Sequence, residues 1–314
     1  MSNSNPSRPG QVEGAGSAFQ LFLTQFAGEV LTQFDAVNQV LPYVTQRTIS
    51  GGRSAQFPVI GTTTAAYHVP GTEILGTPIV HNQVLLTVDM PLIANVFIAN
   101  IDEAMNHYDV RSPYARQLGL ALATTLDRHL LQTSVKAARS PARISTDFGG
   151  SVITSATMNS DVNEVVKALF QAAATLDNKN VPGIGRTAWL RPETFYALVS
   201  AKDTINSLWG GAGSYSEGTV FKIAGIAIKS STHVPNGVVA NGTLEAGYDN
   251  KYAGDFSKTV GVITTQDTVG VLKLMDIQME SEYSVRHQGN LMVAKYAMGH
   301  GVLNPATAIE LAKA

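Results

Sequence analysis

The sequence predicts an α+β protein, in which helices and strands occupy separate stretches of the chain. Residues 113–139 are rich in Ala, Leu, Gln and Arg, which are strong helix formers. Residues 50–95 instead carry short extended runs between many Gly and Pro residues. A third region, residues 221–277, again favours strands. The 314 residues suffice for one large domain or two of ordinary size.

The N-terminal region divides into an arm and a helix. Residues 1–16 are mostly Ser, Asn, Gly and Pro, which predicts a flexible arm and lacks the apolar core of a signal peptide. In residues 18–40, apolar side chains recur at spacings of three and four, and this pattern predicts an amphipathic helix weakened at Gly28. This helix could pack on another chain, or it could be an ordinary N-terminal core helix. Periodicity alone does not distinguish these two interpretations.

The next stretch, residues 50–95, predicts a long hairpin-like excursion without a helix. Residues 83–90 alternate cleanly, with Val84, Leu86, Val88 and Met90 on one face, which is the pattern of a half-buried strand. Residues 57–60 form another short extended run. An ordinary antiparallel sheet in a globular domain is the alternative interpretation.

Residues 113–139 predict a helix roughly 40 Å long at 1.5 Å per residue. Ser112 suits the N-cap and Pro113 the first helical position. One apolar stripe recurs every fourth residue and consists of Leu118, Leu122, Leu126 and Leu130. A helix of this length suits a beam that spans the subunit better than a core helix.

The remaining elements are shorter. Residues 140–160 predict a loop or hairpin, and residues 161–178 a helix with Asp161 as N-cap and Glu164 as its capping-box partner. A strand at 187–190 and a helix at 192–201 follow. Further strands are expected in 221–235 around a glycine turn, at 260–263 and at 269–277. The glycine-rich run 209–214 lacks the Lys-Ser/Thr pair that follows the last glycine of a phosphate loop, and it lacks the characteristic spacing.

Composition excludes several classes of protein. Net charge is −2 without a long basic run, so tight binding to a phosphate backbone is not predicted. The chain has no cysteine, which excludes disulfides, thiolate metal sites and cysteine nucleophiles. No apolar run approaches 18 residues, so no membrane span is expected. Charged residues make up 15% of the chain, against about 25% in a typical soluble domain, which suggests that much of the surface faces other protein.

No constellation of residues indicates catalysis. None of the seven histidines has the spacing of a zinc protease, and no Gly-x-Ser-x-Gly sequence occurs. Asp102, Glu103 and Asp109 are close together, but acids at a helix start usually complement the helix dipole. We therefore expect a protein that is not an enzyme, with no catalytic residue, no cofactor and no bound metal.

Four segments resemble the major capsid proteins of T7-like tailed bacteriophages. They are FAGEVLTQF (26–34), GRSAQFPVIGTTTAAY (52–67), DEAMNHYDVRSPYARQLG (102–119) and KYAMGHG (295–301). The resemblance implies the HK97-like capsid fold, with an N-terminal arm, an extended β loop, a long spine helix, and peripheral and axial domains. Its implied boundaries are 1–49 for the arm, 50–96 for the loop, 97–160 with 262–296 for the peripheral domain including the spine helix 113–139, and 161–261 with 297–314 for the axial domain.

The family implies a structural role. We expect self-assembly into hexamers and pentamers of an icosahedral virion shell around double-stranded DNA, which is contacted without sequence specificity. A scaffolding protein, a portal at one vertex and assembly in the bacterial cytoplasm are further implications, and no membrane partner is expected. An encapsulin-like nanocompartment shell is the alternative, and a soluble α+β enzyme is a more remote one.

The resemblance also suggests which residues touch neighbouring subunits. In the extended loop, which crosses the neighbour in this family, the candidates are Arg53, Phe57 and Tyr67. Before the spine helix they are Asp109 and Arg111. Some relatives of this fold weld the loop through a lysine–asparagine bond, but residues 51–100 contain no lysine. Buried area, hydrogen bonds and strand-edge pairing are therefore expected to hold the loop.

Overall fold

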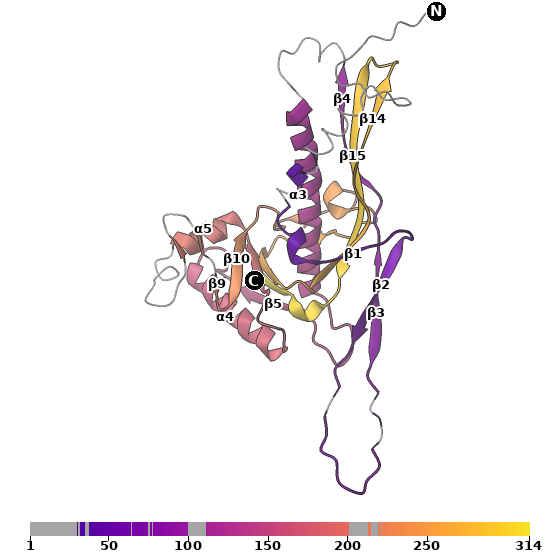
Figure 1. Cartoon of the computed structure of the whole chain (residues 1–314). Coiled ribbons are helices and arrows are strands. Elements are labelled where there is room, and N and C mark those ends of the chain that lie inside the picture. Colours follow the sequence, from indigo (N-terminus) through magenta and orange to yellow (C-terminus); the bar gives the residue numbers. More distant parts are fainter. Residues whose placement is uncertain are drawn as a thin grey trace, which may run out of the picture. The chain divides into compact units, whose positions relative to one another are not determined.

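The computed structural model describes residues 30, 32–34, 38–63, 65–74, 76, 78–99, 111–200, 213–214, 219–220 and 222–314 (Figure 1). They divide into two compact units. Unit 1 comprises Met1–Asn38, Met90–Leu126 and Met275–Met298, and unit 2 comprises Gln39–Asp89, Asp127–Leu274 and Gly299–Ala314. Three elements run through both units: α3 (Arg111–Ala138), β14 (Val269–Ser284) and β15 (Gly289–Val302).

Helix α3 confirms the predicted spine helix. Its 28 residues give a length of about 42 Å at 1.5 Å per residue. The stripe of four leucines is buried over its whole length, at Leu118, Leu122, Leu126 and Leu130. The helix begins at Arg111, two residues earlier than predicted, so Ser112 lies inside the first turn and is not the N-cap. None of the described helices is long and apolar enough to cross a membrane.

In unit 1, β4 (Leu92–Ala99) pairs antiparallel with β15, from Leu92 opposite Tyr296 to Ala99 opposite Gly289. Alternate residues face inward, as a half-buried pair of strands requires, and Met292, Ala294 and Tyr296 are buried. The ring of Phe34 meets Tyr296 edge to face at 6.2 Å between centroids. Most of the predicted helix 18–40 lies outside the described residues, although Val30 and residues 32–34 are helical.

Unit 2 contains the predicted hairpin. Strand β2 (Ser54–Ile60) pairs antiparallel with β3 (His81–Thr87), from Ser54 opposite Thr87 to Ile60 opposite His81 (Figure 1). The inward face of β3 carries Val84 and Leu86, both buried, as the alternation predicted. Met90, which was expected on the same face, is 50% exposed, because the strand ends at Thr87. Before the hairpin lie a 3₁₀ turn at Leu41–Tyr43 and strand β1 (Thr45–Thr48), which pairs in parallel with residues 270–273 of β14.

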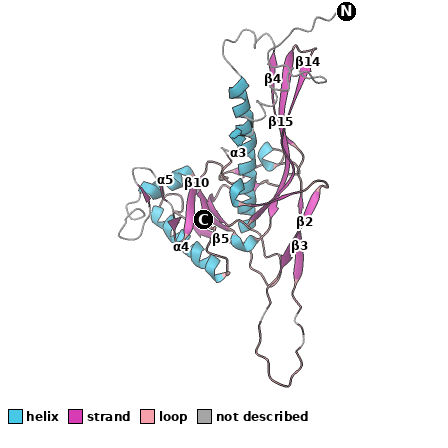
Figure 2. Cartoon of the chain, viewed as in Figure 1, coloured by secondary structure: helices cyan, strands magenta, loops and turns pink. Residues whose placement is uncertain are grey.

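The largest sheet of unit 2 has the strand order β5-β16-β13-β6-β10-β9 (Figure 2). The strands are β5 (Ser151–Ser155), β16 (Ile309–Lys313), β13 (Thr259–Thr264), β6 (Thr187–Leu190), β10 (Ile226–Ser230) and β9 (Lys222–Ile223). Pairing is parallel between β5 and β16 and between β6 and β10, and antiparallel elsewhere. The sequence interpretation of 140–160 as a loop or hairpin was therefore incomplete, because β5 joins this sheet.

Two helices pack on the six-stranded sheet. They are α4 (Val162–Asn178) and α5 (Pro192–Ser200), close to their predicted bounds. Their inward leucines, Leu169, Leu176 and Leu198, share one core with Leu190 and Ile309 of the sheet. Asp161 caps α4 as predicted by accepting the Asn163 N–H at 2.9 Å, but Glu164 bonds Ser155 and Lys167 instead of completing a capping box.

The remaining short elements of unit 2 complete the loops around this sheet. Strands β11 (Val238–Val239) and β12 (Gly254–Asp255) form one pair, and β7 (Gly213–Ser214) and β8 (Thr219–Val220) another. Single 3₁₀ turns lie at Leu244–Ala246 and Pro305–Thr307.

Candidate assembly surface and hairpin anchor

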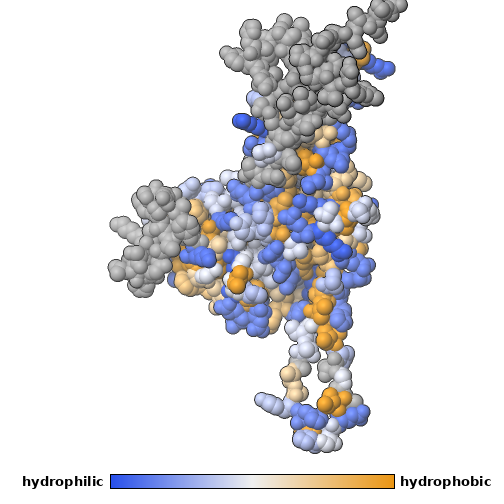
Figure 3. Space-filling model, in the orientation of Figure 1, coloured by the Kyte–Doolittle hydropathy of each residue, from blue (hydrophilic) through white to orange (hydrophobic). Residues whose placement is uncertain are grey.

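The hairpin, defined as β2, β3 and the connecting residues 61–80, exposes many apolar side chains in unit 2 (Figure 3). Tyr67 is fully exposed, and Leu85 on the outer face of β3 is 56% exposed. The other exposed apolar residues are Ile60, Val69, Ile74, Ile79 and Val80. Exposed apolar groups gathered on one feature mark an interaction surface more often than a free surface.

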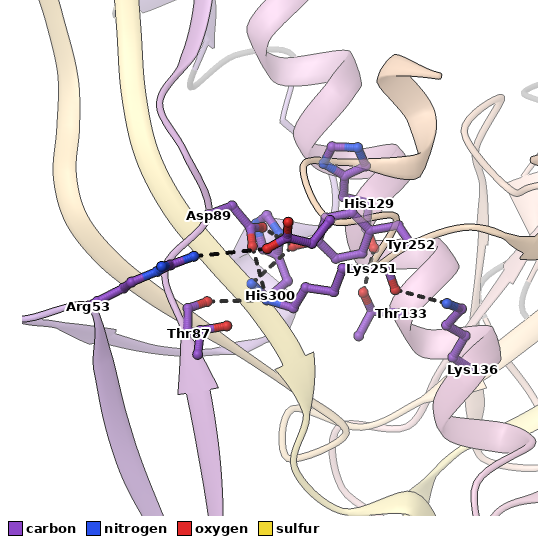
Figure 4. Close-up of polar contacts among 10 residues, drawn as sticks. Arg53, Thr87, Asp89, His129, Thr133, Lys136, Lys251, Tyr252 and His300 are labelled. Atoms are coloured by element: carbon purple, nitrogen blue, oxygen red, sulfur yellow. Dashed lines mark hydrogen bonds and ion pairs between the residues drawn. The ribbon is translucent and has the colours of Figure 1, made fainter. Parts of the chain in front are cut away.

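Both feet of the hairpin are held by one loop, residues 249–252 (Figure 4). At the first foot, the guanidinium of Arg53 lies 3.9 Å from the carboxylate of Asp249. At the second foot, the ammonium of Lys251 lies 3.2 Å from Asp89 Oδ1 and donates to the Thr87 carbonyl, also at 3.2 Å. The Tyr252 hydroxyl bonds Asp89 Oδ2. We call these residues, with His129 and His300, the hairpin anchor.

The anchor loop is fixed in turn by α3 and β15. Lys136 of α3 donates to the Lys251 carbonyl at 2.8 Å. The imidazole of His129, also on α3, stacks on the Tyr252 ring at 4.3 Å between centroids. Gly247 makes room for that ring, because a Cβ there would lie 2.4 Å from a Tyr252 ring carbon and the backbone φ is +72°. The loop therefore connects the hairpin feet to the helix.

The hydrogen bonds of the anchor define where its protons lie. Asp89 is a carboxylate beside Lys251 and can only accept, so the Tyr252 hydroxyl donates to it. The Tyr252 oxygen then accepts from His300, whose Nδ1 lies 2.8 Å away, which places the neutral imidazole's proton on Nδ1. His300 Nε2 is buried and has no hydrogen-bond partner within the described part of the chain.

Burial dominates the ionisation of both anchor histidines. It holds the pKa of His300 well below the ordinary value, and the nearby His129 and Lys251 act in the same direction. Burial also lowers the pKa of His129, and Lys251 adds to that effect, while the hydrogen bond that His129 Nε2 donates to the Leu244 carbonyl and the charges of Asp89 and Glu245 oppose it. Both imidazoles are therefore neutral at pH 7.

A second buried polar contact fixes the start of unit 2. Asp127 of α3 is fully buried and accepts the backbone N–H groups of Gln39 at 2.9 Å and Val40 at 3.2 Å. Burial raises the pKa of Asp127 to about 6, although both hydrogen bonds favour the carboxylate. The carboxylate determines where the N-terminal segment meets α3.

Neither polar cluster has the arrangement of an active site. Asp89, Tyr252 and His300 are joined in one chain of hydrogen bonds. A hollow of about 950 Å³ in unit 2, lined by residues such as Phe57, Arg143 and Lys179, includes none of the three. Among the residues that the structure describes, no three His, Cys, Asp or Glu side chains gather to hold a metal ion. These two polar clusters can hold backbone segments in position, namely the feet of the hairpin and the segment at Gln39 and Val40.

The structure places the five candidate contact residues differently. Arg53 lies in the anchor, and Phe57 is half-buried beneath the Arg47 guanidinium, 5.4 Å from the ring centroid. Tyr67 stands free on the connecting loop. Asp109 and the side chain of Arg111 lie outside the described residues.

Sequence reasoning missed most of the hairpin anchor. Isolated histidines, a tyrosine and a lysine from distant segments carry no shared spacing, so His129, Lys251, Tyr252 and His300 gave no signal. Asp127 did give one, because it follows Leu126 in a helix whose apolar stripe continues to Leu130. An acid at that place has to find hydrogen-bond donors or remain unsatisfied.

Comparison with known proteins identifies the family. A family model described as "Gp10A-like: Major capsid protein" matches residues 56–312. The chain is 31% identical over 322 residues to the major capsid protein of Escherichia phage T7, covering 95% of this chain and 93% of the relative. It is 32% identical over 329 residues to that of Enterobacteria phage T3, with the same two coverages.

A solved structure agrees with these relatives. The capsid structure of cyanophage P-SCSP1u is 37% identical, with a TM-score of 0.79, and the match covers 100% of this chain and 99% of that one. The predicted HK97-like capsid fold is thus confirmed, and these relatives support neither the nanocompartment nor the enzyme alternative. The chain belongs to the Gp10A-like family of phage major capsid proteins, which are structural proteins of the virion shell and not enzymes.

Proposed function

We propose that this chain assembles with copies of itself into hexamers and pentamers of an icosahedral shell that encloses double-stranded DNA. The observation that carries the proposal is the hairpin, whose exposed apolar side chains have no cover within the described part of its own chain. A two-stranded hairpin is marginal by itself and gains stability when a third surface covers it. A neighbouring subunit supplies that surface in a shell.

In this arrangement the hairpin lies across the adjacent subunit. Phe57 and Tyr67 contribute apolar contact, and Arg53 contributes charge near the foot. Asp109 and Arg111 take part from the segment before α3. Each contact is heterologous, because the hairpin of one copy meets a different surface of the next, and such contacts close into rings when the rotation permits.

The domain organisation follows the family pattern. Residues 1–49 form the arm, 50–96 the extended loop, 97–160 with 262–296 the peripheral domain, and 161–261 with 297–314 the axial domain. A scaffolding protein guides curvature during assembly in the bacterial cytoplasm, and a portal occupies one vertex. The near-neutral net charge of −2 suits packaged DNA that is enclosed without tight binding.

Electron microscopy with matched variants tests the proposal. The chain is expressed with and without a candidate scaffolding protein, and negative-stain images are scored for closed polyhedral particles. The double variant Tyr67→Ser with Ile74→Ser removes apolar groups from the hairpin, and Val238→Ser with Leu244→Ser removes comparably exposed ones elsewhere in unit 2. We expect shells from the wild type and the second variant, and folded but unassembled protein from the first.

Two outcomes would contradict this expectation at different levels. Wild-type protein that stays monomeric with its scaffolding protein present would overturn the shell proposal itself. Normal shells from the Tyr67→Ser, Ile74→Ser variant would keep the shell and remove the hairpin as its contact surface. Circular dichroism of each variant separates a loss of assembly from a loss of folding.

A further inference from the structure

We infer that the hairpin anchor is an acid-released clamp, in which proton uptake by His300 and His129 frees the feet of the hairpin. The geometric basis is that one short loop serves both feet: Asp249 binds Arg53, and Lys251 and Tyr252 bind Thr87 and Asp89. Because Tyr252 is also the hydrogen-bond partner of His300, a change at that histidine reaches the hairpin through a single hydroxyl group.

His300 is built to stay neutral. Its Nδ1–H is used by Tyr252, and its Nε2 is enclosed with no partner among the described residues. A second proton on Nε2 would create a buried donor without an acceptor and a buried positive charge. The ring centroid of His129 is 6.1 Å away, so protonation of either imidazole disfavours protonation of the other while the clamp is closed.

The charged groups around the two histidines do not remove this penalty. On the hairpin side, both oxygens of Asp89 are occupied by Lys251 and Tyr252. On the side of α3, Lys136 adds positive charge near the loop, and Arg128 pairs with Glu245. Arg53 and Asp249 form an exposed pair at the other foot. Asp89 is the nearest anion. If Asp89 accepted a hydrogen bond from an imidazolium, it would lose its contact with Lys251 or Tyr252, and that loss would also loosen the second foot of the hairpin.

The direction of the pH effect follows from the neutral closed state. Opening exposes both imidazoles to water, where their pKa returns to about 6.5, so the open state binds more protons below that pH. Each proton taken up on opening shifts the equilibrium about tenfold per pH unit. The feet of the hairpin should therefore be protected at pH 7.5 and exchange faster at pH 5, while the six-stranded sheet remains closed.

Hydrogen exchange read by mass spectrometry tests the clamp in the full-length protein. Exchange at pH 7.5 and pH 5.0 is corrected for the intrinsic pH dependence of amide exchange and followed in peptides that cover 81–89 and, as an internal reference, 187–190 and 259–264. In the wild type we expect at least about a tenfold loss of protection at 81–89 and none in the reference peptides. In His129→Gln, His300→Gln the same change should shrink to less than about twofold.

Two further variants keep the test decisive. His287→Gln changes an exposed histidine outside the anchor and should behave as wild type. Lys251→Met removes a foot contact while both histidines stay in place, so its 81–89 peptides should exchange rapidly already at pH 7.5. Wild-type protection at 81–89 that persists to pH 5, or an undiminished pH effect in the double histidine variant, would overturn the inference. Equal loss in the reference peptides would also overturn it, because it would show global unfolding.

Discussion

The six-stranded sheet and the hairpin show two ways of stabilising β-structure within one unit. The sheet buries its strands against α4 and α5, and residues such as Leu190, Ile263 and Ile309 are completely enclosed. The hairpin buries one face near its feet and leaves Leu85, Tyr67 and Ile74 in water. The sheet is held by its own core. The hairpin instead combines one buried face with polar contacts at its feet and along its strands, such as the bond from Asn82 to the Arg143 carbonyl, and its outer face is exposed.

This difference implies that folding and assembly depend on different side chains. Changes in the sheet should act on the free energy of unfolding of the subunit, and changes on the outer face of the hairpin should act on contacts between subunits. A structural protein that must fold before it assembles benefits from keeping the two functions on different side chains.

The sharpest test places the same charge in both regions. Leu190→Asp buries an unpaired carboxylate at the centre of the sheet and should destabilise the subunit by more than about 4 kcal/mol, enough to prevent folding. Leu85→Asp places the carboxylate at a position that is 56% exposed and should leave the subunit folded but impair assembly. Chemical denaturation and particle counts by electron microscopy measure the two effects. Equal unfolding in both variants would remove the distinction.

Ion pairs provide a second contrast. Arg139 donates to both carboxylate oxygens of buried Glu310, each at 2.6 Å, and Arg139→Ala should cost about 3–5 kcal/mol because it strands that charge. Arg53→Ala breaks an exposed pair at 3.9 Å and should cost less than about 1 kcal/mol. Urea denaturation midpoints of the two variants give the comparison, and similar shifts would show that burial is not the deciding factor.

Asp127 extends the contrast to pH. Burial raises its pKa to about 6 from an ordinary value of 3.8, so the folded state binds this proton more tightly than the unfolded chain. The associated stability is complete below about pH 4 and is lost as pH rises through about 6, a change of about 3 kcal/mol. Asp127→Asn should remove that loss from a curve of unfolding free energy against pH.

The two anchor histidines act in the opposite direction over an overlapping range, since their lowered pKa values reduce stability as pH falls below about 6.5. The wild-type curve minus the Asp127→Asn curve isolates the carboxylate. Asp276→Asn, at an exposed acid, serves as the control for a simple loss of charge. Identical wild-type and Asp127→Asn curves would mean that Asp127 does not titrate in this range.

A modest effect is expected at the start of helix α4. Asp161 accepts the Asn163 N–H at 2.9 Å, so Asp161→Ala should destabilise the sheet region by about 1 kcal/mol without changing assembly at low temperature. Thermal unfolding followed by circular dichroism measures it. Asp161→Asn should retain most of the stability, because its side-chain oxygen still caps the helix. A cap variant that remained fully folded but did not assemble would contradict the expectation that changes in the sheet region act on folding alone.

Local patterns predicted the elements that depend on neighbours in sequence. The four leucines of α3, the alternation at Val84, Leu86 and Val88, and the cap at Asp161 were all visible in advance. Patterns could not predict β5, because its partner β16 is more than a hundred residues away and no turn connects the two. For the same reason the anchor stayed hidden, since Asp89, Tyr252 and His300 meet only after folding.

The position of β16 has a consequence for synthesis of the protein on the ribosome. Residues 309–313 lie inside the six-stranded sheet, between β5 and β13, and supply Ile309 and Leu311 to its core and Glu310 to Arg139. Translation must therefore pass residue 313 before the sheet can close. A polypeptide released earlier would lack an interior strand, keep two unpaired edges and remain a substrate for chaperones and proteases. Interrupted chains would thus be removed before they could enter a growing shell.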